Sequence, residues 1–255
     1  MIILTQENFI LKKPDHILCD ADGTSVFDGT HSFSSNLREA VASSLIPFSL
    51  NTGREFHETK ELISQLPRQI HFVAGGSTIV YPNGKALILS KLSCEQIDIL
   101  CGILAKHDPK EIKFMRNGRW SFELGTINEP IPVVSFNFEY DKIKAHKVKD
   151  EIINLNNNFS AVVTTDGKSF FVHVSPKGFD KAKAVEYLIK HKKINRSKIT
   201  SFGDQTNDIP LFKASGTALM VENGAHELRE HAHGIIPSVE KDGVALALTH
   251  LASLK

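Results

Sequence analysis

Three apolar runs in this chain each lead directly into a short polar motif, and this repeated arrangement constrains the fold more than any other feature. The runs are His16–Cys19, Ile46–Leu50 and Ile199–Phe202, and the motifs that follow them are Asp20-Ala21-Asp22-Gly23-Thr24, Asn51-Thr52-Gly53-Arg54 and Gly203-Asp204-Gln205-Thr206-Asn207-Asp208. Helix-like stretches alternate with these strand-like runs, so we expect right-handed parallel crossovers. The carboxyl ends of parallel strands meet at one sheet edge, the usual place for an active site in α/β proteins. The chain therefore predicts an α/β fold with its polar motifs gathered at one edge.

The helices of this parallel core are expected from the spacing of apolar residues. Ser34 or Ser35 can cap the first of them and Asp180 a later one. The expected helices and their inward-facing side chains are 36–45 (Leu37, Val41, Leu45), 56–66 (Leu62, Ile63, Leu66), the helix after Asp180 (Ala184, Val185, Leu188, Ile189) and 209–214. A further short strand is expected over 70–73.

The pattern changes at about residue 82. Hairpin turns are indicated at Tyr81–Lys85, Arg116–Arg119 and Thr165–Lys168, each centred on Asn-Gly or Asp-Gly between apolar or aromatic residues. Two helix-like stretches, 94–105 and 146–155, lie among them. Hairpins with two helices predict an α+β module built on an antiparallel sheet. We therefore expect residues 1–81 and 178–255 to form the parallel core and residues 82–177 to form an inserted domain.

Composition limits the partners and the compartment. The chain has 255 residues and a net charge of +1, so it lacks the charge excess of a nucleic-acid-binding or membrane-attracting surface. No apolar run approaches the ~18 residues that span a bilayer. Three scattered cysteines fit reduced thiols, and the first twenty residues do not read as a secretion signal. We expect a cytoplasmic protein, a monomer or homodimer, that binds neither nucleic acid nor membrane.

The first motif carries two carboxylates directly after a strand. Asp20 is a candidate nucleophile toward phosphorus and a magnesium ligand, and Asp22 is a candidate general acid and base. Magnesium accepts few protein oxygens, here those of Asp20, the Asp22 carbonyl and Asp204. The competing interpretation is a solvated turn after a strand, which a motif this short also fits.

The second motif and a later lysine supply candidate phosphate-binding groups. Thr52 and Gly53 place a hydroxyl and backbone N–H groups at a helix start, although Asn-Thr-Gly-Arg is also a common turn. Lys181 follows the capping Asp180, where a cation is unfavourable for the helix dipole, so a role in neutralising phosphate is expected in preference to Lys177 or Lys183.

The last motif offers a second pair of carboxylates. Asp204 and Asp208, four residues apart across a strand-to-helix turn, can face one cation. Asn207 can hydrogen-bond a phosphate or hold a carboxylate in place. Asp208 can instead serve as the N-cap of the following helix, and both interpretations stay open.

Taken together, the order and intervals of these motifs resemble the haloacid dehalogenase (HAD) superfamily of hydrolases, and within it the Cof-type (subfamily IIB) phosphatases with a C2B cap. The resemblance extends to Asn223-Gly224-Ala225 and Asp242-Gly243-Val244. It implies a Rossmann-like parallel-sheet core with an inserted α+β cap over 82–177. It also implies a nucleophile, Asp20; an acid/base, Asp22; phosphate holders, Thr52 and Lys181; and a Mg²⁺ set of Asp20, Asp22, Asp204 and Asp208.

The expected function is Mg²⁺-dependent hydrolysis of a small phosphorylated metabolite such as a sugar phosphate. One alternative is a phosphosugar mutase similar to phosphomannomutase, suggested by Phe202-Gly203-Asp204-Gln205-Thr206. The compact Asp204-to-Asp208 spacing favours hydrolysis, because that branch carries a longer glycine-containing insert. A second alternative is a non-catalytic sensor of phosphorylated ligands on the same fold.

Overall fold

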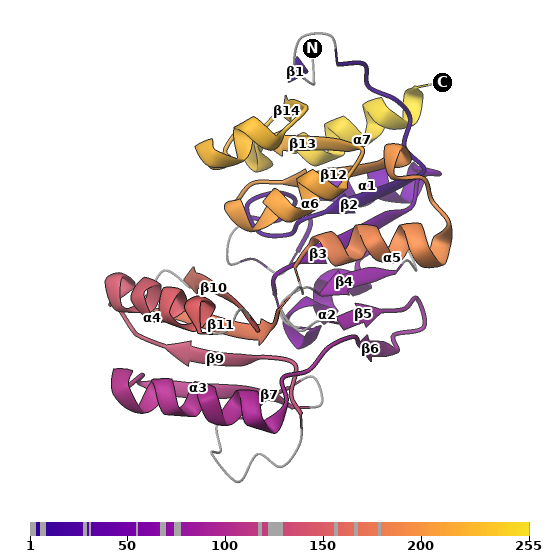
Figure 1. Ribbon diagram of the computed structural model, residues 1–255. Helices are drawn as coiled ribbons and strands as arrows, with labels where there is room; N and C mark the ends of the chain where they lie inside the picture. Colours follow the sequence, from indigo (N-terminus) through magenta and orange to yellow (C-terminus); the bar gives the residue numbers. More distant parts are fainter. Residues whose placement is uncertain are drawn as a thin grey trace.

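The computed structural model of the chain contains two β-sheets, and the chain enters the second sheet between two passages through the first. It describes residues 4–5, 9–27, 30, 32–54, 56–66, 70–73, 78–116, 119–121, 130–155, 158–165, 168–177 and 180–254. Figure 1 shows the second sheet with its helices to one side of the larger one, and the first strand (Leu4–Thr5) and last helix (Gly243–Ser253) near the far end of the larger sheet.

The first sheet has nine strands and a parallel centre. Its strands are β1 (Leu4–Thr5), β2 (His16–Cys19), β3 (Phe48–Thr52), β4 (His71–Val73), β5 (Thr78–Val80), β6 (Ala86–Ile88), β12 (Ile199–Gly203), β13 (Thr217–Val221) and β14 (Gly234–Ile236). They lie in the order β1-β14-β13-β12-β2-β3-β4-β5-β6. The six strands from β14 to β4 are parallel, whereas β1, β5 and β6 pair antiparallel at the two ends. The predicted α/β fold is confirmed.

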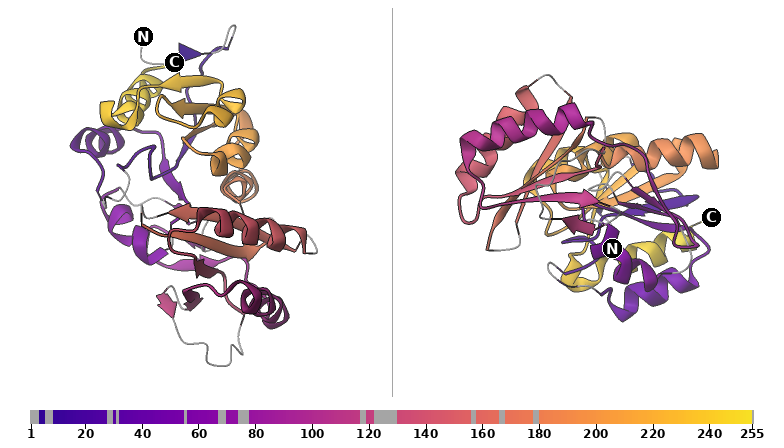
Figure 2. Two further views of the ribbon diagram at one scale, coloured as in Figure 1. Left: turned by 90° about the vertical axis from the view of Figure 1, so that its left-hand side faces the viewer. Right: turned by 90° about the horizontal axis from the view of Figure 1, so that it is seen from below.

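Helices cover both faces of this sheet, which explains why its central strands are apolar throughout. One face packs on α1 (Ser35–Ser43), α2 (Phe56–Ser64) and α7 (Gly243–Ser253) through a cluster that includes Phe48, Leu62 and Leu248. The other packs on α5 (Ala182–Lys192) and α6 (Ile209–Ala214) through Leu188 and Phe212. The result is a three-layer α/β/α arrangement, visible in the two views of Figure 2.

The second sheet is antiparallel and carries helices on one face. It contains β7 (Glu111–Arg116), β8 (Arg119–Ser121), β9 (Val134–Asn137), β10 (Phe159–Thr165) and β11 (Phe170–Pro176) in the order β10-β11-β9-β7-β8. Helices α3 (Cys94–His107) and α4 (Lys142–Asn154) pack on it around Phe114, Phe136 and Val172. The hairpins predicted near residues 116–119 and 165–168 are present as the β7–β8 and β10–β11 pairs; residues 117–118 and 166–167 lie outside the described residues.

The hairpin predicted at 81–85 belongs to the first sheet. Tyr81 N–H donates to the Lys85 carbonyl, and Gly84 adopts a φ of +78° between β5 and β6. The larger sheet therefore extends to residue 88. The division of the chain into a core and an inserted domain over 82–177 remains a prediction.

Two expected core residues lie at the surface. Leu45 is 99% exposed because α1 ends at Ser43, and Ile46 is buried in its place. Ile189 is 40% exposed on α5, whose buried side is formed by Ala184, Val185 and Leu188. Among the described helices, each is too short or too polar to cross a bilayer.

Candidate active site

The polar motifs meet where three neighbouring parallel strands end. β2 lies between β12 and β3, with Cys19 opposite both Phe202 and Leu50. The residues that leave these strands therefore emerge side by side, as the sequence predicted. Buried carboxylates from the first and last motifs lie together at this edge: one oxygen from each of Asp20, Asp204 and Asp208 lies within 4.8 Å of the others.

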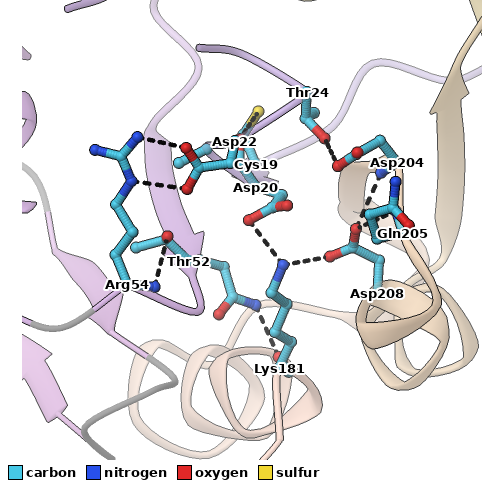
Figure 3. A network of polar contacts seen from close by, with 12 residues as sticks. Cys19, Asp20, Asp22, Thr24, Thr52, Arg54, Lys181, Asp204, Gln205 and Asp208 are labelled. Atoms are coloured by element: carbon cyan, nitrogen blue, oxygen red, sulfur yellow. Dashed lines mark hydrogen bonds and ion pairs between the residues drawn. The ribbon is translucent and has the colours of Figure 1, made fainter. Parts of the chain in front are cut away.

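Lys181 lies between two of these carboxylates. Its Nζ lies 2.7 Å from Asp20 Oδ1 and 2.6 Å from Asp208 Oδ1, and the lysine side chain is only 3% exposed. Figure 3 shows the ammonium group pointing between the two acids. Lys181 directly precedes α5, and Ala182 N–H donates to Asp180 Oδ1 at 2.9 Å, as expected for a carboxylate at a helix start.

Asp204 is held by the first motif. Thr24 Oγ1 donates to Asp204 Oδ1 at 2.7 Å, and the carboxylate lies against Gly23. Gly23 has a φ of +71°, and a Cβ placed on it would lie 2.4 Å from Asp204 Oδ2. A glycine is required there on both counts.

Asp208 turns back toward the end of β12. Its Oδ2 accepts the backbone N–H groups of Asp204 at 3.0 Å and Gln205 at 3.1 Å. It precedes α6 without a side-chain capping bond to that helix. Asp208 therefore holds the N-cap position of α6 without capping that helix through its side chain, and its second oxygen is used by Lys181.

Burial and crowding of like charges shape the electrostatics. Burial raises the pKa of Asp20 well above its usual value, with Lys181 opposing and Asp208 and Asp204 adding to the effect. Burial also raises the pKa of Asp204 to about 6 against the hydrogen bond from Thr24. Burial alone lowers the pKa of Lys181, but the attraction of Asp20 and Asp208 outweighs it, so the net pKa is raised and the ammonium stays charged.

This cluster fits a divalent cation. With all three carboxylates ionised, the three acids and the one ammonium would carry two net negative charges in a buried site, and the raised pKa values of Asp20 and Asp204 reflect the cost of that charge without a counter-ion. All the candidate ligand atoms are oxygens, the ligands that Mg²⁺ prefers, and it commonly takes only one or two carboxylates from the protein. The carboxylates present therefore suit Mg²⁺.

The Asp22 carboxylate lies outside this cluster. It forms a two-pronged ion pair with Arg54, whose Nε donates to Oδ2 at 2.7 Å while Nη2 contacts Oδ1. Arg54 Nη2 also donates to the Thr30 carbonyl at 2.8 Å. Figure 3 shows Asp22 facing Arg54 and pointing away from Lys181. Any contact of Asp22 with the metal set would therefore come from its backbone carbonyl rather than its carboxylate.

The remaining predicted residues lie nearby. Thr52 is buried at the end of β3, and its Oγ1 accepts the Arg54 backbone N–H at 3.1 Å. Gly53 and the exposed Asn207 are neighbours: a Cβ on Gly53 would lie 3.8 Å from Asn207 Nδ2. The strand-end loops of β3 and β12 thus bring together the groups expected to meet a phosphate.

Several contributors were not assigned a role from the sequence. Thr24 positions Asp204, and Asn51 Nδ2 donates to the Lys181 carbonyl at 2.8 Å. Asn223 Nδ2 donates to the Gly23 carbonyl at 2.8 Å, and Ala225 N–H donates to the Asp204 carbonyl at 2.7 Å. The resemblance of Asn223-Gly224-Ala225 to the family marked the last two positions, but no sequence pattern predicts the bond made by Asn51.

Comparisons with known proteins agree with this fold. The profile of the haloacid dehalogenase-like hydrolase family matches residues 17–248. A phosphoglycolate phosphatase of Archaeoglobus fulgidus is 24% identical over 95% of this chain and 99% of its own length. Among solved structures, a HAD-superfamily phosphatase of Bacteroides thetaiotaomicron superposes with a TM-score of 0.77 at 18% identity, covering 96% of this chain and 99% of its own. A HAD subclass IIB sugar phosphatase superposes with a TM-score of 0.74 at 17% identity, covering 92% and 98%.

The chain belongs to the haloacid dehalogenase-like hydrolase family. It is a phosphatase of that family, and the predicted membership and enzyme class are confirmed. The roles of individual site residues, the metal and the substrate remain to be proposed.

Proposed function

We propose that the chain hydrolyses a small phosphomonoester in a Mg²⁺-dependent reaction that passes through a phospho-aspartate on Asp20. The observation that carries this proposal is the buried cluster of Asp20, Asp204 and Asp208 around Lys181 at the ends of adjacent parallel strands. An acid that is both next to an ammonium and part of a cation-binding set can attack a phosphoryl group whose charge the same set neutralises.

The metal would be held by Asp20, Asp204 and the Asp22 carbonyl, with Asp208 as a further ligand or as a support for Lys181 and the β12 loop. Bound there, Mg²⁺ supplies positive charge that offsets the charge of the phosphoryl group during transfer. The net negative charge that the ionised cluster would carry supports this assignment.

The residues divide the reaction into two displacements. An Asp20 carboxylate oxygen forms a bond to phosphorus as the ester P–O bond breaks, and Asp22 protonates the departing oxygen. Asp22 then removes a proton from water, whose oxygen attacks phosphorus, releases inorganic phosphate and restores Asp20. Thr52, Gly53, Asn207 and Lys181 would hold the phosphoryl oxygens through both steps.

Asp22 must change its hydrogen bonding to act as an acid. Its carboxylate is occupied by Arg54 in the present structure. A protonated Asp22 cannot accept both prongs of the guanidinium, so protonation and release from Arg54 are coupled. Arg54 is thus a natural point of control over the leaving-group proton.

The second sheet, with α3 and α4, would act as the cap over this site. It leaves the first sheet after β6, the edge strand, and returns just before Lys181, so the returning connection reaches the core at the site. Closure of such a unit would exclude bulk water and select the leaving group. Phosphoglycolate and sugar phosphates are the first substrates to test, because relatives bear those activities in their names.

The test is phosphate release by the purified protein from a panel of phosphorylated metabolites, with and without Mg²⁺, followed by Asp20→Asn on the best substrate. We expect turnover to require the metal, and Asp20→Asn to lower kcat by at least about 10³-fold. Thermal unfolding of the variant should stay cooperative, which separates loss of chemistry from loss of fold. Turnover by Asp20→Asn near the wild-type rate would contradict the assignment, and an isomerised sugar phosphate would favour a mutase.

A further inference from the structure

Asn51 occupies a position where an apolar side chain would be easier to bury. It lies on β3 directly before Thr52, and it is 1% exposed. Its Nδ2 donates to the backbone carbonyl of Lys181 at 2.8 Å, whereas its Oδ1 has no hydrogen-bond partner among the described residues. A buried carbonyl oxygen that has lost water and gained no donor opposes folding. Stability alone therefore does not explain an asparagine here.

The bond that Asn51 does form joins two parts of the site that are 130 residues apart in the sequence. β3 is a central strand of the larger sheet and is buried along its whole length, so it is a rigid support. Lys181 lies at the other end of the bond, at the point where the chain returns from the second sheet and α5 begins. The amide therefore fixes the backbone of Lys181 relative to the strand that carries Thr52.

The position of that backbone determines where the ammonium lies. Lys181 Nζ must reach Asp20 at 2.7 Å and Asp208 at 2.6 Å simultaneously. Lys181 has no side-chain capping bond of its own at the start of α5. A lysine side chain has several rotatable bonds, so a shift of its Cα is enough to favour one carboxylate over the other or to withdraw the ammonium from a bound phosphate.

We propose that Asn51 is a positioning residue for Lys181: its buried amide anchors the Lys181 carbonyl to β3 so that the ammonium stays between Asp20 and Asp208 and faces the phosphoryl group. This inference rests on the proposed role of Lys181 in holding phosphate. It assigns Asn51 no contact with the substrate. Any effect of Asn51 on the reaction rate should then depend on the presence of the Lys181 ammonium.

A double-mutant cycle tests this prediction. Asn51→Ala, Lys181→Met and the double variant are compared with the wild type for kcat, for KM and for inhibition by inorganic phosphate. We expect Asn51→Ala to lower kcat about 10- to 100-fold and to weaken phosphate inhibition in the wild-type background. In the Lys181→Met background the same change should alter kcat by no more than about twofold, because the group it positions is gone.

Ser49→Ala provides the matched control. Ser49 lies two residues earlier on β3, is fully buried and also makes a side-chain hydrogen bond, to His16 at 2.8 Å. Its loss should lower the melting temperature while leaving kcat and phosphate inhibition within about twofold of wild type in both backgrounds. If Asn51→Ala fails to fold, Asn51→Leu fills a similar volume and removes the donor, and it should show the same dependence on Lys181.

The outcomes separate the two proposals. Equal fold-losses from Asn51→Ala with and without the Lys181 ammonium would show a general structural role and overturn the inference, as would an Asn51→Ala enzyme with wild-type kcat. A Lys181→Met enzyme with unchanged kcat and phosphate inhibition would instead overturn the role proposed for the lysine itself. If Lys181→Met loses activity and adding Asn51→Ala to that variant leaves kcat unchanged, the roles proposed for Lys181 and for Asn51 are both supported.

Discussion

Gly23 shows how one backbone position limits the shape of the acidic cluster. Its φ of +71° suits glycine, and any β-carbon there would overlap the Asp204 carboxylate. Gly84 shares the first property but not the second, since its φ is +78° and a Cβ would have open space within 4 Å. Comparing substitutions at the two glycines therefore separates the effect of backbone strain from the effect of a steric clash with Asp204, a proposed metal ligand.

We expect Gly23→Ala and Gly84→Ala to pay a similar backbone penalty of about 1–2 kcal/mol in unfolding free energy. Only Gly23→Ala should weaken Mg²⁺ binding and lower kcat, by at least about tenfold, because Asp204 must move. Denaturant unfolding and a Mg²⁺ titration of activity measure the two effects. Equal metal affinity in both variants would mean that Asp204 does not bind the ion.

At the scale of single residues, the sequence predicted the charged groups of the site better than it predicted the hydrogen bonds and ion pairs that hold the site residues in place. The sequence predicted that Asp20, Asp204 and Lys181 lie at one candidate site, because their chemistry is visible in the residue type and in its place after a strand or at a helix start. The hydrogen-bond partners of Asn51 and Asp22 were not predicted. Those bonds join residues 130 and 32 positions apart in the sequence, and they depend on how three strands align. An amide or guanidinium has the same appearance in a sequence whether it is solvated or buried.

At the scale of elements, helix and strand existence was predicted well and the ends less well. α6 occupies the expected residues, whereas α1 ends at Ser43 and leaves Leu45 exposed. Apolar periodicity continues past the point where the backbone leaves the helix, so it cannot locate the last turn. The pattern also could not show that the hairpin after Tyr81 pairs with the larger sheet.

The helix caps offer a test of the predicted inserted domain. Ser93 caps α3 through a reciprocal pair with Gln96, at 3.2 Å and 2.9 Å, and Ser34 caps α1 through Leu37 N–H at 3.0 Å. Replacing either serine with alanine should cost about 1 kcal/mol. If residues 82–177 unfold independently, Ser93→Ala should lower hydrogen-exchange protection in β9 and β11 but not in β2 and β3.

Ser34→Ala should have the reverse distribution of effects, with reduced protection confined to the larger sheet and its helices. The two variants thus serve as controls for each other, because they remove the same kind of bond from helices on different sheets. A uniform loss of protection across both sheets in either variant would show one cooperative unit and contradict the division into two domains.

For the molecule as a whole, acid stability depends on two histidines buried in the larger sheet. His16 Nε2 contacts Ser49 Oγ at 2.8 Å, and His71 Nδ1 accepts the Leu50 N–H at 3.2 Å. Burial lowers the pKa of each to about 4, with a smaller contribution from Lys192 for His16 and from His16 for His71. The unfolded chain, with histidine pKa values near 6.5, therefore binds more protons between these limits, and folding loses stability as pH falls.

The site has the opposite dependence over part of the same range. Burial raises the pKa of Asp204 to about 6, so that carboxyl favours the folded state at low pH and opposes it as pH rises from about 4 toward 6. A pH–stability curve of the wild type alone therefore mixes two effects of opposite sign. The difference in unfolding free energy between the wild type and a histidine variant isolates the histidine, because the carboxyls are common to both.

As the pH falls from 7.5 to 5, we expect the unfolding free energy of His16→Gln to rise by about 2 kcal/mol relative to that of the wild type. The reason is that the variant has no imidazole to protonate on unfolding. Below about pH 4 the difference should level off, since the native imidazole then binds the proton as well. His146→Gln, which replaces an exposed histidine on α4, serves as the control. Urea unfolding at each pH measures the difference, and a gap between His16→Gln and wild type that stays constant from pH 7.5 to 5 would show that His16 does not remain neutral in the folded protein.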